Sequence, residues 1–259
     1  MIESSRMWMT GETRRAFNWS ASHHFAYEVD GSGPPLILLH GLSGSARWWA
    51  RNVPAFVTSF RTYTVDLPGF GQSRGVPWSR LDETADRLAE WIATEGLTPA
   101  NVVGHSLGGA VAARLAAHYP GSVHRLVLVD AAIQPSRMRR ISSPIKAMRS
   151  IRRGSPGFTP MLVSDLLRSH PRSFILATVD ALQTGWEPHL TRITAPTLVV
   201  WGERDAITPL TLGHAIAETV RDASLIVLPD AGHNPMWECA DTFNAEVLRF
   251  LAGPGEPGS

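Results

Sequence analysis

The sequence predicts an α/β protein with one mostly parallel central sheet that is covered by helices on both faces. Short runs rich in Val, Ile and Leu recur along the chain, and longer segments with helical periodicity separate them. The runs are apolar at successive positions, which is typical of parallel strands buried on both faces. A chain of 259 residues suits one such domain with an insertion.

Six apolar runs are expected to form the buried strands, because each is short and is bounded by Gly, Pro or Asp. They cover residues 36–40, 61–66, 101–105, 124–130, 196–202 and 223–229. An alternating pattern over residues 14–29 predicts an antiparallel hairpin at the edge of the sheet.

Three segments between these runs are expected to be helices, at residues 81–96, 107–120 and 239–253. In the first segment, four apolar residues recur on one face, and Gly96 can end the helix in the left-handed conformation. Those four residues are Leu81, Ala85, Leu88 and Ile92.

Residues 132–192 interrupt the alternation, since they contain helical patterns but no buried-strand pattern. We therefore expect a core of residues 1–131 and 193–259, with residues 132–192 forming a helical cap. Ligands bind at the carboxyl ends of the strands in such sheets, so the cap would cover a ligand site.

The composition excludes several classes of protein. A net charge of +1 gives no general attraction to nucleic acid, and one cysteine allows neither an intrachain disulfide nor a cysteine-based zinc site. The first residues have no apolar segment of a secretory signal, and no apolar run approaches the roughly 18 residues of a membrane span. We expect a cytoplasmic protein.

The stretch "GHSLG" places Ser106 in a G-x-S-x-G motif between a predicted strand and a predicted helix. In this setting the turn is tight, and Gly104 and Gly108 avoid collisions with neighbouring backbone. The turn would expose the Ser106 hydroxyl at the end of the sheet. We predict a nucleophile there rather than an incidental loop serine.

A serine nucleophile needs a base and a carboxylate that orients the base. Of the ten histidines, His233 follows the last predicted strand and ends at the same sheet edge as Ser106. Asp205 follows the preceding strand, which gives the chain order Ser106, Asp205, His233. Asp130, at the end of the strand after the serine helix, and Glu203 are alternatives for the acid.

The reaction also needs donors for an oxyanion, and the backbone N–H groups of Leu42 and Leu107 are the candidates. Leu107 opens the serine helix and Leu42 follows the first parallel strand. His40 and His105 adjoin these turns and are expected to shape them. Acyl transfer from serine to water calls for no metal and no cofactor.

At these stretches the chain resembles the α/β-hydrolase fold superfamily, as a serine esterase- or lipase-like member with a short helical cap. The matching segments are LLHGLSGSARWW, VDLPGFGQS, VVGHSLGGA, VWGERDAITP and LPDAGHNPMWE, in the family's order. The resemblance implies Ser106 as nucleophile, Asp205 as acid, His233 as base, and Leu42 and Leu107 as oxyanion donors.

Serine at this turn argues against haloalkane dehalogenases and epoxide hydrolases, which carry aspartate there, and against dienelactone hydrolases, which carry cysteine. Plant-type hydroxynitrile lyases use the same three catalytic residues and, in addition, a lysine near the substrate. Lys146 is the only lysine here, so this activity stays open but has little support from the sequence.

These residues predict a carboxylic-ester hydrolase that acts on a small-molecule ester. Alternatives are a lactonase, a carbon–carbon bond hydrolase of a diketone-type substrate, a hydrolase of carrier-protein or CoA esters or thioesters, and a non-catalytic binding protein. The predicted pocket is lined by Gly41, Trp48, Trp186, Met236 and Trp237, whereas Trp49 and Trp201 are expected in the core. A basic stretch at residues 137–153 could attract an anionic substrate or a carrier protein, although it more often marks a solvated helix face.

Overall fold

The computed structural model describes residues 6–7, 16–20, 22–133, 157–183 and 187–253. Within these residues, one nine-stranded sheet has the order β1-β2-β3-β5-β4-β6-β7-β8-β9. The strands are β1 (Arg6–Met7), β2 (Ala16–Ser20), β3 (Phe25–Asp30), β4 (Pro35–Leu39), β5 (Arg61–Asp66), β6 (Ala100–His105), β7 (Val123–Val129), β8 (Thr197–Gly202) and β9 (Ala223–Leu228).

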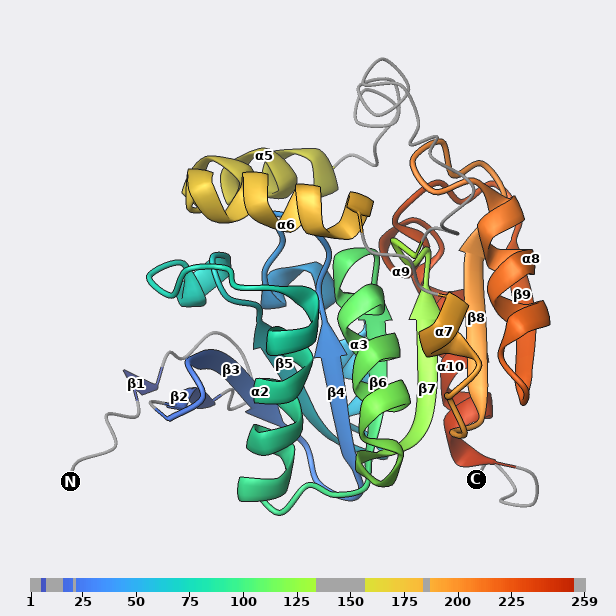
Figure 1. Ribbon diagram of the computed structural model, residues 1–259, viewed down its shortest axis with the longest axis horizontal. Helices are drawn as coiled ribbons and strands as arrows, with labels where there is room; N and C mark the ends of the chain where they lie inside the picture. Colours follow the sequence, from blue (N-terminus) through green and yellow to red (C-terminus); the bar gives the residue numbers. More distant parts are fainter. Residues whose placement is uncertain (1–5, 8–15, 21, 134–156, 184–186, 254–259) are drawn as a thin grey trace.

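The sheet is antiparallel from β1 to β5 and parallel from β5 to β9. This arrangement confirms the mostly parallel sheet, and the pairing of β2 with β3 confirms the edge hairpin. The parallel strands end at the upper edge of the sheet in Figure 1. In register, Leu39 of β4 lies beside Gly104 of β6, so the loops after these two strands are neighbours.

Helices cover both faces of the sheet. They are α1 (Val53–Phe56), α2 (Leu81–Thr94), α3 (Leu107–His118), α5 (Phe158–Arg168), α6 (Pro171–Gln183), α7 (Glu187–Leu190), α8 (Leu210–Thr219), α9 (Pro235–Glu238) and α10 (Ala240–Ala252), with short 3₁₀ turns η1 (Ala46–Trp49), η2 (Gly71–Ser73) and η3 (Pro120–Ser122). Successive side chains of β4 enter opposite layers: Ile37 and Leu39 pack with α2, α3 and α8, and Leu36 and Leu38 pack with α1 and α10.

The predicted helices and strands agree closely with the structure, with one exception. Leu81, Ala85, Leu88 and Ile92 are all buried on α2, and Gly96 follows that helix with φ +68°. The prediction that every apolar run is buried on both faces is wrong for β9. This strand is at the sheet edge, and Ala223, Leu225, Ile226 and Val227 are only partly buried there.

The helices α5 and α6 lie across the carboxyl ends of the parallel strands (Figure 1). Helix α7 instead packs against α3 and α8, so the last part of the predicted cap lies beside the sheet. The division of the chain at residues 131 and 193 stays a prediction, and the basic stretch at 137–153 lies outside the described residues.

Asp165 of α5 makes hydrogen bonds and an ion pair with polar side chains of the core. This buried carboxylate accepts hydrogen bonds from Ser45 Oγ at 2.8 Å and Trp48 Nε1 at 3.1 Å, and it pairs with Arg47. All three partners follow β4 in the chain. The loop after β4 is therefore tied directly to α5.

Two further contacts fasten α6. The hydroxyl of Ser173 accepts the backbone N–H of Trp78 at 3.0 Å, and the carboxylate of Asp180 accepts the N–H of Leu81 at 2.6 Å. The second contact satisfies a backbone donor in the first turn of α2, which has no partner within its own helix. Among the described residues, no helix has the length and apolar character needed to cross a bilayer.

Candidate active site

Ser106 occupies a strained turn between β6 and α3. Its φ of +50° and ψ of −112° lie in a region that side chains rarely adopt. A Cβ on Gly104 would lie 2.5 Å from the carbonyl oxygen of Gly108, and one on Gly108 would lie 2.6 Å from that of His40. The structure therefore confirms that both glycines are needed for the turn.

Backbone hydrogen bonds hold this turn on two sides. The N–H of Ser106 donates to Val129 O at 2.9 Å, and its carbonyl oxygen accepts from Ala110 N at 3.1 Å and Ala132 N at 2.9 Å. The last residue of β7 and the segment that follows it thus hold the backbone of Ser106 from the neighbouring strand. The backbone that carries the Ser106 side chain is consequently fixed at the end of the sheet.

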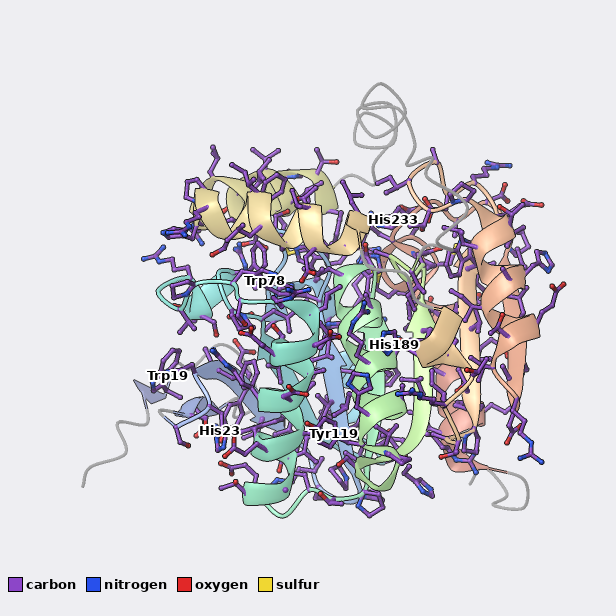
Figure 2. The ribbon with its side chains drawn as sticks, viewed as in Figure 1. Trp19, His23, Trp78, Tyr119, His189 and His233 are labelled. Atoms are coloured by element: carbon purple, nitrogen blue, oxygen red, sulfur yellow. The ribbon has the colours of Figure 1, made fainter. Side chains whose placement is uncertain are left out.

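Three side chains from separate loops meet at this edge. His233 Nε2 lies 3.1 Å from Ser106 Oγ, and His233 Nδ1 lies 2.7 Å from Asp205 Oδ2. Asp205 lies in the loop after β8 and His233 in the loop after β9, so parallel strands bring together residues that are distant in the sequence. Figure 2 shows His233 at the upper end of the sheet, close below the level of α6.

Asp205 is held as a carboxylate by its surroundings. Its Oδ1 accepts the N–H groups of Ile207 at 2.7 Å and Thr208 at 3.0 Å, and the Thr208 hydroxyl bonds to Oδ2. Burial alone would raise the pKa of Asp205. The charge of His233 and the hydrogen bonds from His233, Thr208 and Ile207 outweigh burial and hold that pKa below its usual value.

The two alternative acids lie in different surroundings. Asp130 is fully buried and uses Oδ1 to accept Gly202 N at 3.0 Å. Burial, followed by the negative charge of Asp205, raises the pKa of Asp130 well above its usual value, which favours the neutral form. Glu203 is exposed. The geometry therefore favours Asp205 as the partner of His233.

Two buried histidines support the loops around Ser106. His40 Nε2 accepts the N–H of Leu67 at 2.9 Å, so its Nδ1–H donates to Gly41 O at 2.7 Å. His105 Nε2 lies 2.7 Å from the carbonyl oxygen of His233 and must donate to it. Burial lowers the pKa of His40 to about 4 and that of His105 to about 3, so both rings are neutral.

Among the described residues, two clusters of side chains have the residue types of a metal site. His105, Asp130 and His233 form one cluster, but His105 and His233 use ring nitrogens for the hydrogen bonds given above. Asp82 of α2, His118 of α3 and His189 of α7 form the other, and Figure 2 shows His189 well below His233. There Asp82 already pairs with Arg114 at 2.7 Å.

Comparison with known proteins identifies the chain at the level of its family. Residues 36–246 match the model of the alpha/beta hydrolase family. The chain belongs to this family.

Two curated relatives of this alpha/beta hydrolase have different named reactions. A 2-hydroxy-6-oxononadienedioate/2-hydroxy-6-oxononatrienedioate hydrolase of Burkholderia vietnamiensis is 33% identical over 87% of this chain and 90% of its own. A pimeloyl-[acyl-carrier protein] methyl ester esterase of Chromobacterium violaceum is also 33% identical, over 86% of this chain and 96% of its own.

A solved structure confirms the fold of the hydrolase. A thermophilic esterase from Thermogutta terrifontis superimposes with a TM-score of 0.78 over 97% of this chain and 98% of its own, at 24% identity.

The predicted pocket residues of the hydrolase differ in how deeply they are buried and in what they contact. Gly41 lies against His105, where a Cβ would come within 2.8 Å of Nδ1. Trp48 is almost fully buried against Phe158, and Met236 is fully buried in the core on the α10 side of the sheet. Trp237 is partly buried and lies under the guanidinium of Arg51.

The fifth predicted pocket residue, Trp186, lies outside the described residues. Trp49 and Trp201 are fully buried, which confirms their prediction as core residues.

Three residues that hold Asp205 or the loops around the site of the hydrolase were not predicted from the sequence. Thr208 bonds to Asp205 and lies 3.3 Å from His233 Nδ1, and Asp165 connects α5 to the loop after β4. Asp66 accepts the N–H groups of Ala46 at 2.6 Å and Gln72 at 2.8 Å. Thr208 and Asp66 lie beside predicted loops and Asp165 lies in a segment with a helical pattern, and polar residues are too common in both settings to single these three out.

Proposed function

We propose that this hydrolase cleaves carboxylic esters through an acyl-enzyme on Ser106. The observation that carries the proposal is the chain of contacts from Asp205 through His233 to Ser106, at 2.7 and 3.1 Å. In this proposal α5 and α6 of the inserted segment 132–192 act as a cap over the site, whereas α7 packs beside the sheet, and a small-molecule ester is the substrate.

The contacts specify the direction of proton transfer. The carboxylate of Asp205 can only accept, so Nδ1 of His233 carries the proton and Nε2 has a free lone pair. As Ser106 Oγ attacks the acyl carbon, Nε2 takes the hydroxyl proton. The resulting imidazolium is stabilised by the negative charge of Asp205.

Two backbone donors would stabilise the tetrahedral intermediate, namely the N–H groups of Leu42 and Leu107. Leu107 is the first residue of α3, where the helix dipole favours negative charge. The intermediate collapses when its C–O bond breaks and His233 returns the proton to the leaving alcohol. Water then attacks the acyl carbon while His233 takes its proton. The bond from the acyl carbon to Ser106 Oγ breaks as His233 returns that proton to Oγ, which releases the carboxylic acid.

A second candidate is the hydrolysis of a carbon–carbon bond beside a ketone. It is favoured by the relative from Burkholderia vietnamiensis, whose name describes a 2-hydroxy-6-oxo-dienedioate as substrate. The same serine, histidine and oxyanion donors serve an attack on the ketone, but the leaving group is then a carbon that must be protonated. Lactones and carrier-protein or CoA esters and thioesters are further acyl substrates for the same residues.

A direct comparison of substrates tests the proposal. Purified protein is assayed with p-nitrophenyl acetate and butyrate, with a simple lactone, and with 2-hydroxy-6-oxo-6-phenylhexa-2,4-dienoate. We expect ester turnover that Ser106→Ala abolishes, together with a mass increase of one acyl group on Ser106 after a brief reaction. Ester turnover equal in wild type and Ser106→Ala would refute it, whereas turnover of the dienoate alone would select the second candidate.

A further inference from the structure

The outward side of α5 and α6 is apolar. Of the eight large hydrophobic side chains exposed among the described residues, seven lie on these two helices. We call them the outer cap face: Val163, Leu166, Leu167, Ile175, Leu176, Val179 and Leu182. Leu167 is 82% exposed and Ile175 60%, while the eighth residue, Trp19, lies on β2 at the antiparallel end of the sheet (Figure 2).

The outer cap face repeats with helical periodicity. On α5, Val163 is three and four residues from Leu166 and Leu167, and on α6 Leu176, Val179 and Leu182 follow one another at intervals of three residues, with Ile175 beside Leu176. On α5 the inward side holds Phe158 and Asp165, and on α6 it holds Ser173 and Ala177. Both helices therefore carry apolar residues on the side that faces away from the core, where a helix that faces water ordinarily carries polar residues.

On these two helices the acidic side chains face the core, whereas the arginines are exposed. The two acidic residues of 157–182 are both used inward, since Asp165 is buried against the loop after β4 and Asp180 accepts the N–H of Leu81. Arg168 and Arg172 are exposed at the turn between the helices. Within 157–182 the exposed surface is thus apolar and cationic, without an exposed acidic side chain.

We propose that the outer cap face binds the surface of an anionic lipid bilayer. Apolar side chains on one side of a helix enter the boundary between headgroups and acyl chains, and neighbouring arginines are attracted to the negative surface. Helix α5 has 11 residues and α6 has 13, so each lies in the interface instead of crossing a bilayer, which takes about 20 residues.

The position of these helices gives the binding an orientation. Since α5 and α6 lie across the carboxyl ends of the strands, docking would turn the edge that carries Ser106 toward the lipid (Figure 1). This inference does not depend on the reaction, because binding to lipid requires no turnover.

Vesicle flotation with the full chain measures the binding. One set of vesicles contains phosphatidylcholine only, and in a second set about a third of the lipid is phosphatidylglycerol. We expect the protein to float with the second set, and to float less with the first or at high salt, because salt screens the attraction of the arginines.

Matched variants separate the apolar and cationic contributions. Leu167→Ser with Ile175→Ser should lower partitioning into the anionic vesicles by about tenfold or more, and Trp19→Ser is its exposed apolar control. Arg168→Gln with Arg172→Gln should remove most of the dependence on phosphatidylglycerol. Arg192→Gln with Arg221→Gln is the control for loss of two exposed positive charges.

Circular dichroism and unchanged hydrolysis of a short soluble ester would show that each variant is folded. The proposal is refuted if wild-type protein stays out of both sets of vesicles, or if the Leu167 and Ile175 double variant floats like wild type. It is equally refuted if sedimentation shows a wild-type dimer that this double variant converts to a monomer, since a second copy would then cover the face.

Discussion

Replacing Asp205 by Asn should reduce activity far more than replacing Asp130 by Asn. In Asp205→Asn the neutral amide no longer stabilises the imidazolium of His233. If its NH₂ group faces Nδ1, the imidazole moves its proton to Nε2, which then cannot accept the proton of Ser106. In Asp130→Asn the amide oxygen still accepts the N–H of Gly202, and the side chain is uncharged like the protonated acid that burial favours.

The size of the difference follows from these contacts. A hydrogen bond to a charged group contributes about 1.5–3 kcal/mol, and its loss here is combined with the cost of the wrong imidazole tautomer. We therefore expect kcat to fall about 10³- to 10⁴-fold in Asp205→Asn, equivalent to about 4–5.5 kcal/mol in the barrier. For Asp130→Asn we expect less than about a tenfold change, since no reacting group loses a partner.

Steady-state kinetics with a p-nitrophenyl ester measures both variants, and thermal melts establish that both are folded. Ser106→Ala sets the background rate. The reasoning is refuted if Asp130→Asn is the more impaired of the two, because Asp130 would then be the acid that orients His233. Equal and small losses in both variants would show that His233 does not need a carboxylate partner.

Three further changes have distinct expected outcomes. Gly108→Ala should destabilise the fold by about 2–4 kcal/mol in urea unfolding, because its Cβ would collide with the carbonyl oxygens of Leu39 and His40; a variant as stable as wild type would contradict the close packing at this turn. Asp165→Leu should lower the melting temperature by about 6–12 °C, since it leaves donors from the loop after β4 unpaired in a buried site, and an unchanged melt would show that this contact does not hold the loop. Burial raises the pKa of Asp66 to about 7 from 3.8, so as the pH rises the unfolded chain releases this proton before the folded chain does. The free energy of unfolding of the wild type should therefore fall between about pH 4 and pH 7, and that of Asp66→Asn should vary less over the same range. Parallel curves of unfolding free energy against pH would refute the raised pKa.

Features that depend on local patterns could be predicted from the sequence. The strands, the amphipathic face of α2 and the glycines around Ser106 are visible because burial periodicity and backbone conformation constrain neighbouring residues. The order of the motifs along a parallel sheet then indicated that Ser106, Asp205 and His233 lie at the same edge. Their actual distances required the register of the strands.

Features that depend on packing between distant segments could not be predicted in this way. The apolar composition of β9 resembles that of an inner strand, and only its place at the sheet edge leaves it half-buried. Asp165 lies 117 to 120 residues from its partners Ser45 and Trp48 in the sequence, and His105 lies 128 residues from His233. A sequence pattern of a few residues carries no information about such pairs.

The backbone hydrogen bonds that Ser106 donates to Val129 and accepts from Ala132 have a consequence for protein engineering. They mean that the nucleophile is held partly by the four residues that join the core to the inserted segment. A chimera that exchanges this segment for that of another hydrolase should therefore keep 129–132 from the host and place its first junction after Ala132. A junction placed even two residues earlier would exchange, together with the inserted segment, part of the backbone that supports the reactive serine.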